Sequence, residues 1–243
     1  MVLDDPKFKA LQPDFIFALH NVPGFPRHAI VVKEDNFAMA SEGVLILLRG
    51  HAAHAAYPEQ GISPLPALAE LNDKLPHIAA NKRIFKYFVQ LTITYIKTGR
   101  FGFGTVPGSA ELALTLRAEE SHELERLHAE MKRVVAKTAT RYYLEEQFKR
   151  FEPYSVTRNN KTAVDAIRKV ATRHHFSLIE LAEPFRWSED FGNFTKSFPG
   201  AMFGLGAGEN HSDLHTWYYD FPDEILETGI KMFYGIIQDL AND

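Results

Sequence analysis

The sequence VQLTITYIKTGRFGFGTVPGSAELALTLRA, residues 89–118, contains two runs in which apolar and polar residues alternate. The first run covers residues 89–95, the second covers residues 112–116, and a Pro107-Gly108 turn lies between them. Alternation with a period of two is typical of a strand that buries one face against a core. We therefore expect two strands of one sheet here, joined by a loop.

The residues around this strand pair predict a complete small domain. Before it, the apolar run at residues 43–49 predicts a buried strand, and apolar residues at three- and four-residue steps over residues 64–78 predict an amphipathic helix. After it, residues 121–135 predict a second helix with Ser121 as its N-cap, and residues 142–151 predict a weaker final strand. The order strand, helix, strand, strand, helix, strand predicts the ferredoxin-like split βαβ arrangement, a sheet with both helices on one face.

The residues on either side of this unit predict an α/β domain. Residues 14–21 alternate and end at a Pro-Gly turn, which indicates a strand. From Lys161 onward the pattern predicts in turn a helix, a strand at residues 177–181, a short helix at residues 188–195, a strand at residues 201–205 and a helix at residues 223–240. The fold class is therefore α/β, with an α+β domain at residues 41–153 inserted between α/β parts at residues 1–40 and 154–243.

The outer α/β domain is short of strands in this sequence. An α/β layer needs paired strands within the sheet and helices over both of its faces. We therefore expect the sequence to be a portion of a longer protein. We also expect apolar surface to be exposed where the remaining part would pack.

Composition and charge exclude several classes of protein. With 45% hydrophobic and 24% charged residues the composition is that of an ordinary globular protein, and a formal net charge of −4 without a basic run argues against nucleic-acid binding. The apolar runs are too short to span a bilayer, and Asp4 and Asp5 stand where a secretory signal needs basic residues, so we expect a soluble, cytoplasmic protein. The absence of cysteine excludes disulfides, Cys-ligated zinc and a thiol nucleophile, whereas eleven histidines allow a His/carboxylate metal site.

Two histidines stand where a ligand site can form. His20 ends the first predicted strand, and ligand crevices of α/β sheets form at strand ends. His215 follows a glycine-rich run at residues 204–208, where the backbone can approach a ligand closely. The alternatives are a strand-end histidine bonded to a neighbour and an ordinary polar loop. His211 lies four residues before His215, but Ser212 stands where the zincin motif needs Glu, so the pair gives little support to a zincin site.

Three further positions allow a functional and a structural interpretation. His54, flanked by alanines in a strand-to-helix loop, either faces a cleft or is simply exposed. Arg117, at the end of a strand whose leucines point the other way, either grips a carboxylate or is a solvated surface residue. Glu189 and Asp190 open the short helix at residues 188–195, where the helix dipole favours acids, but they could also orient a metal-bound histidine.

Several segments stand in the order of the conserved blocks of a known family. These are DFIFALHNVPGFP (14–26), GHAAHAAYP (50–58), the turn at residues 99–111, TLRA (115–118), WSEDF (187–191), PGAMFGLGAG (199–208) and LHTWYYDFPDEIL (214–226). Over essentially its whole length the chain resembles the peptidase M20 metallo-amidohydrolases. It is most similar to the subgroup that cleaves N-acyl amino acids, such as hippurate, N-acetyl-diaminopimelate and auxin-conjugate hydrolases.

The resemblance implies a role for several residues. His20 and His215 match metal ligands of a two-metal site that would take zinc or manganese. His54 matches a histidine that reaches across a homodimer to polarise the substrate carbonyl, and Arg117 matches an arginine that binds substrate. The inserted domain would be the dimerisation or lid domain, and the substrate a small N-acyl amino acid.

The chain departs from the family pattern in two places. The family usually has Asn-Val-Ile-Pro where this chain has Gly104-Thr105-Val106-Pro107, so an amide expected beside the substrate is replaced by Gly104. The upstream blocks, a Cys-Gly-His-Asp metal motif and a Glu-Glu pair that holds the general base, have no counterpart. Since a catalytic zinc takes at least three protein ligands, two histidines alone do not make the site.

Two functions follow from these observations. In the first, the chain is a portion of a metal-dependent N-acyl-amino-acid amidohydrolase and is inactive in the absence of the remaining ligands and the base. In the second, it is a non-catalytic remnant that dimerises or binds a ligand. Metal content and hydrolysis of N-acetyl amino acids distinguish the two.

Overall fold

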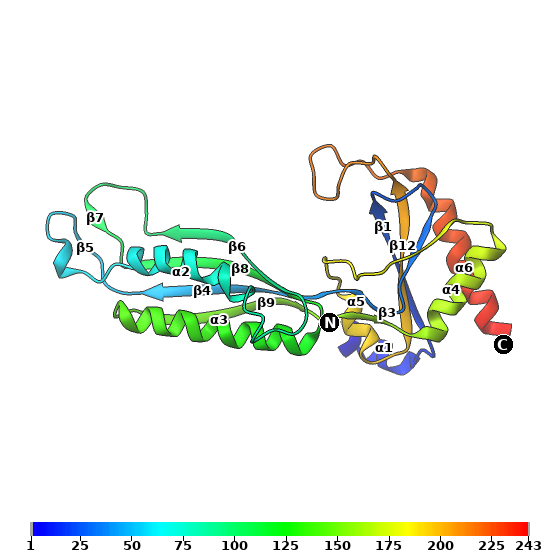
Figure 1. Cartoon of the computed structure of the whole chain (residues 1–243), viewed down its shortest axis with the longest axis horizontal. Helices are drawn as coiled ribbons and strands as arrows, with labels where there is room; N and C mark the ends of the chain where they lie inside the picture. The colour runs from blue at the N-terminus through cyan, green and yellow to red at the C-terminus, as the bar shows by residue number, and fades with distance from the viewer. Residues whose placement is uncertain (1, 243) are drawn as a thin grey trace. The chain divides into compact units, whose positions relative to one another are not determined.

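The computed structural model describes residues 2–242, and the chain folds into two compact units. One unit runs from Met39 to Ser155, and the other combines the residues up to Ala38 with those from Val156 onward. Figure 1 shows how the chain enters the inserted unit once and leaves it once. We describe each unit separately.

The inserted unit has the predicted order of elements (Figure 1). These are β4 (Ala40–Arg49), α2 (Leu65–Ile78), β6 (Val89–Thr98), β8 (Ser109–Ala118), α3 (Ser121–Arg141) and β9 (Glu145–Tyr154). The four strands lie in the order β6-β8-β4-β9, and all neighbouring pairs are antiparallel. This is the split βαβ arrangement expected from the sequence.

Alternation along the strands explains why the sheet has one covered face. Leu112, Leu114 and Leu116 of β8 are buried, and they point toward the side on which α2 and α3 pack. The helices bury apolar residues in return, including Leu71 and Leu75 of α2. Beyond the end of this sheet, β5 (Ala53–His54) pairs with β7 (Thr105–Val106), and the 3-10 helix η2 (Pro58–Gln60) follows.

The other unit is a mixed sheet rather than a parallel one. Its strands β1 (Ile16–Pro23), β12 (Gly200–Gly208), β2 (Ile30–Val32) and β11 (Leu178–Glu180) lie in that order, and the central pair β12 and β2 is antiparallel. Helices α4 (Lys161–Arg173) and α6 (Leu226–Asn242) share a core with one face. A separate cluster around Phe37 and Met202 packs elsewhere in the unit. The remaining helical segments are η1 (Val2–Asp4), α1 (Pro6–Leu11), α5 (Phe191–Thr195) and η3 (Asp223–Ile225).

A second, two-stranded sheet was not expected from the sequence. It consists of β3 (Asp35–Ala38) and β10 (Thr157–Asn159). Buried Asn159 joins it to the main sheet, because its side-chain amide donates to the carbonyl oxygens of Lys33 and Met202 and accepts from the Met202 amide at 2.8 Å. Strands of three or four residues are too short to give a periodic signal, so alternation alone does not reveal them.

Three local expectations were wrong. The N-cap of α3 is Glu120, and Ser121 is the first helical residue. Strand β9 begins at Glu145, because the preceding residues form the turn that ends α3. The short helix α5 begins at Phe191, so Glu189 and Asp190 precede it, and Asp190 makes no side-chain capping hydrogen bond.

Candidate functional site

The predicted ligand His20 lies near the carboxyl end of β1, beside β12. Its Nδ1 is 2.7 Å from the carbonyl oxygen of Asn21, and because a carbonyl only accepts, Nδ1 carries the proton. Its Nε2 lies 3.4 Å from Oε1 of Glu189, so Nε2 carries the lone pair when the ring is neutral and faces this carboxylate with a proton when the ring is charged. The ring of Trp187 lies 5.0 Å from the imidazole ring, centroid to centroid, and limits its rotation.

The Glu189 carboxylate experiences competing influences. Burial raises the pKa of this carboxyl, His20 and His215 act in the opposite direction, and the neighbouring charge of Asp190 raises it further. The net result is a pKa above the ordinary value of 4.5. A half-buried carboxylate beside two histidines is an environment in which a cation at this position would be stabilised.

His215 belongs to the segment between β12 and η3. Its backbone has a φ of 64°, the left-handed conformation, which is uncommon for a residue other than glycine. The same segment is tied to β1, because the side-chain amide of Asn21 donates to the hydroxyl of Tyr219. His211 lies against Tyr219, with ring centroids 5.5 Å apart. No helix holds His211 and His215 on one face, since this part of the chain consists of turns and bends.

These residues provide part of a metal site. His20 Nε2 and Glu189 Oε1 are a nitrogen and an oxygen donor of the kinds that zinc and manganese accept. Among residues 2–242, however, no group of three or more His, Asp or Glu side chains is close enough to hold an ion. The donor types fit a divalent metal, and the number of donors falls short of the set that a catalytic site needs.

The inserted unit brings two of its predicted site residues together. His54 pairs with Thr105 across β5 and β7, and the amide of Ala55 donates to the carbonyl oxygen of Gly104 at 3.1 Å. His54 is exposed, and its Nδ1 accepts a hydrogen bond from the Ala56 amide at 3.0 Å, which leaves Nε2 as the proton-bearing nitrogen. A Cβ at Gly104 would meet nothing within 4 Å, so the missing side chain leaves open space.

Arg117 is far from that pair within the same unit. It pairs with Ser41 at one end of the strands. Arg49 pairs with Ser109 at the other end, next to the loops that carry His54 and Gly104. At about 3.4 Å per residue, the eight steps along the strand from Ser109 to Arg117 span about 27 Å. Arg117 is half-buried, and burial lowers the pKa of its guanidinium. One inserted unit therefore does not gather these three residues at one point.

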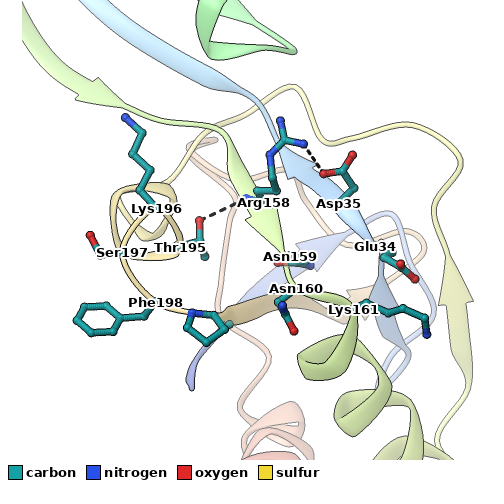
Figure 2. A pocket seen from close by; sticks show the side chains of 12 residues that line it. Glu34, Asp35, Arg158, Asn159, Asn160, Lys161, Thr195, Lys196, Ser197 and Phe198 are labelled. Carbon is teal, nitrogen blue, oxygen red and sulfur yellow. Dashed lines mark hydrogen bonds and ion pairs between the residues drawn. The ribbon is translucent and has the colours of Figure 1, made fainter. Parts of the chain in front are cut away.

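A cavity of about 670 Å³ elsewhere in the outer unit contains none of the predicted site residues (Figure 2). Figure 2 shows the side chains that line it, among them Glu34, Asp35 and Phe198. Its cation Arg158 forms an ion pair with Asp35, and Lys161 forms one with Asp165. Two of the three cations that line the cavity are therefore paired with carboxylates, and its lining contains no histidine that could bind a metal.

Comparison with known proteins explains the two-part architecture. Residues 41–142 match the peptidase dimerisation domain of the M20 family. The chain is 25% identical over 241 residues to the N-acetyldiaminopimelate deacetylase of Bacillus subtilis, covering 99% of this chain and 64% of that protein. The chain belongs to the M20 peptidase family.

Other M20 proteins give the same picture. The N-acetylcysteine deacetylase of Bacillus subtilis is 25% identical over 218 residues, covering 90% of this chain and 57% of that protein. The crystal structure of Bacillus subtilis YXEP protein, a dinuclear metal binding peptidase from the M20 family, matches with a TM-score of 0.75 at 22% identity, covering 97% of this chain and 59% of that one. The chain thus spans less than two thirds of the length of these relatives and corresponds to their C-terminal portion.

The M20 match confirms the predicted fold class, an M20 dimerisation domain within a partial α/β fold. Sequence reasoning did not identify Trp187, which packs on His20, or Tyr219, which binds Asn21. Trp187 lies just before the acidic pair and Tyr219 lies after His215, both in segments that carried the resemblance. These aromatic residues could therefore have been chosen as candidates from the sequence. Within residues 2–242, no helix has the length and apolar content needed to cross a membrane.

Proposed function

We propose that this chain provides the C-terminal part of a metal-dependent amidohydrolase that cleaves the amide bond of N-acyl amino acids. The observation that carries the proposal is the contact between His20 Nε2 and Glu189 Oε1 at the carboxyl end of β1, where His215 is near enough to affect the pKa of Glu189. Two relatives, N-acetyldiaminopimelate deacetylase and N-acetylcysteine deacetylase, support the substrate class.

In this proposal the residues have separate tasks. His20 and His215 bind a zinc or manganese ion, and Glu189 and Asp190 keep the surroundings of these ligands negative. A bound metal pair supplies an activated water and polarises the scissile carbonyl. The proton on Nδ1 of His20, held by the Asn21 carbonyl, keeps Nε2 free to act as a ligand. Further ligands and a general base come from a segment outside these residues.

The inserted unit contributes to substrate binding in a homodimer. His54, whose exposed Nε2 bears a proton, donates a hydrogen bond to the substrate carbonyl in the partner subunit's site. The open space at Gly104 accommodates substrate bulk, and Arg117 binds the substrate carboxylate. The wide separation of Arg117 from His54 within one unit is compatible with the two residues serving different sites of the dimer.

Metal titration tests the proposal on the 243-residue chain. Zn²⁺ or Mn²⁺ should bind, and His20→Ala should weaken binding at least about tenfold, equivalent to about 1.4 kcal/mol. His77→Ala, which removes an exposed histidine from α2, is the matched control and should bind as the wild type does. Equal affinities in the wild type and His20→Ala would show that His20 is not a ligand.

A second function is favoured by the completeness of the inserted unit. Residues 41–142 match the dimerisation domain and form a closed core, whereas the metal site has too few donors. A protein that dimerises and binds an acyl amino acid without hydrolysing it would have these features. A dimer by light scattering, ligand binding by calorimetry and no metal-dependent affinity change would support this second function over the first.

A further inference from the structure

The loop that joins β6 to β8 carries two phenyl rings that the inserted unit does not cover. Phe101 and Phe103 are 96% and 89% exposed, and their ring centroids lie 5.5 Å apart in an edge-to-face arrangement. Single exposed apolar side chains are common on protein surfaces and need no explanation. Two adjacent aromatic rings that leave nearly all of their surface in water instead mark a surface that binds something.

The turn that carries these rings is anchored at both of its ends. At its start, the amide of Gly99 donates to the carbonyl oxygen of Ser109 at 3.3 Å. At its end, the carbonyl oxygen of Gly104 accepts a hydrogen bond from the Ala55 amide at 3.1 Å. Residues 100–103 are the part of the chain between these two hydrogen-bonded residues. The exposure of the phenyl rings is therefore a property of a short, anchored turn and not of a long free loop.

The same loop connects the phenyl rings to His54. Phe103 directly precedes Gly104, and the next residue, Thr105, pairs with His54 across β5 and β7, which Figure 1 shows at one end of the inserted unit. The side chain of Tyr57 is 55% exposed, and its ring centroid lies 6.2 Å from that of His54. Gly104 leaves open space, because a Cβ there would meet nothing within 4 Å. The chain neighbours of this open position are therefore an aromatic ring on one side and, through Thr105, the imidazole on the other.

These side chains match the chemistry of an apolar acyl group. Nε2 of His54 bears a proton and donates to a carbonyl oxygen. The rings of Phe101 and Phe103 offer apolar surface to the carbon atoms attached to that carbonyl, and a third ring packs on such a pair edge-to-face or offset. An acetyl group supplies a single methyl, which is too small to cover either ring. A larger apolar acyl group fills the open space at Gly104 and covers the rings at the same time.

We infer that Phe101 and Phe103 are specificity-determining residues that select an apolar acyl group larger than acetyl. The inference rests on the proposed function, in which His54 donates to the substrate carbonyl. Because the phenyl pair and His54 belong to paired segments of one unit, they act on the same substrate molecule. The preferred acyl group therefore differs from the acetyl group in the names of the relatives, N-acetyldiaminopimelate deacetylase and N-acetylcysteine deacetylase.

Ligand-observed NMR titration of the full 243-residue chain tests the inference. The probes N-phenylacetylglycine and N-acetylglycine differ by a single phenyl ring, and EDTA in the buffer keeps metal out of the measurement. N-phenylacetylglycine should bind at least about tenfold more tightly, because its ring packs on the phenyl pair. Replacing both Phe101→Ser and Phe103→Ser should remove this preference. Tyr234→Ser, which removes a 63% exposed aromatic side chain from α6, is the control and should keep it.

Three results would overturn the inference. These are equal affinities for the two probes, no binding of either probe, and an unchanged preference in the double Phe variant. Circular dichroism should show that this variant remains folded, because both side chains are almost fully exposed. The inference also fails if the phenyl pair instead joins two copies of this chain, seen as a dimer by light scattering that the double variant alone converts to monomer.

A further variant separates this inference from the proposed function. His54→Ala should weaken both probes by a similar factor, because both contain the carbonyl that His54 binds. If His54→Ala changes neither affinity, the proposed role of His54 is wrong, and the phenyl preference is still measured by the double Phe variant. Loss of the metal proposal would be seen elsewhere, as a metal affinity that His20→Ala leaves unchanged, since the probes are titrated without metal.

Discussion

Replacing Glu42 by Gln should destabilise the inserted unit strongly. The Glu42 side chain is fully buried on the helix side of β4, and its Oε1 lies 2.5 Å from Nδ1 of His128 on α3. Its Oε2 accepts hydrogen bonds from Arg150 on β9, so one carboxylate joins a central strand, a helix and an edge strand. Glutamine keeps the shape and removes the charge.

The expected loss in the free energy of unfolding follows from the two side chains that lose their charged partner. Removing one partner of a buried ion pair costs about 3–5 kcal/mol. Arg150 is 42% exposed and keeps a hydrogen bond to Glu125 at 2.9 Å, so losing its contact with Glu42 costs little stability. The His128 side chain is only 11% exposed and loses its charged partner. We expect a loss of about 3 kcal/mol, which for a unit of this size lowers Tm by about 10 °C.

Urea and thermal unfolding followed by circular dichroism measure this effect. Glu125→Gln is the control, because it removes an exposed partner of Arg150 and should cost less than about 1 kcal/mol. A loss below about 1 kcal/mol in Glu42→Gln would refute the reasoning, because it would show that the buried carboxylate contributes no more than a surface pair.

The stability difference between the wild type and Glu42→Gln should also depend on pH. Burial raises the pKa of Glu42, but the hydrogen bonds and charges of His128 and Arg150 outweigh it and hold the pKa below the ordinary 4.5. A group with a lowered folded-state pKa stabilises the fold fully above its unfolded pKa. The difference should therefore be constant at neutral pH and shrink as the pH falls below 4.5.

Three further predictions concern single sites. Asn159→Ala should cost about 3 kcal/mol in urea unfolding, because it leaves buried backbone groups of two segments without partners, whereas Asn160→Ala removes only a helix N-cap and should cost about 1 kcal/mol. Gly206→Ala should destabilise the outer unit by about 1–3 kcal/mol in the same assay, since the added Cβ would lie 2.0 Å from a proline carbonyl oxygen. In an NMR titration the Glu70 carboxyl should have a pKa of about 2, because the hydrogen bond from Lys74 outweighs its desolvation; Lys74→Ala should raise this pKa, and an unchanged value would contradict that cause.

The sequence alone was enough to predict the strands, helices and topology of the inserted unit. Alternation over residues 89–95 and 112–116 and the helical spacing over residues 64–78 are local patterns, and each is set by which side chains face the core. Their order along the chain then fixes the split βαβ topology, because only a few arrangements cover one face of such a sheet. The ordered blocks that include His20 and His215 likewise indicated the M20 family.

Only the tertiary structure decided which side chains meet and which surfaces remain open. Asn21 and Tyr219 are 198 positions apart in the sequence, and His20 meets Glu189 because α5, which follows Glu189, packs against β1. The mixed direction of the sheet that contains β1 and the exposed apolar residues of α6, such as Ile230, also gave no local signal, because a helix with two apolar flanks looks in sequence like one that is simply more deeply buried. Contacts of this kind depend on strand order and packing, which residue periodicity does not specify.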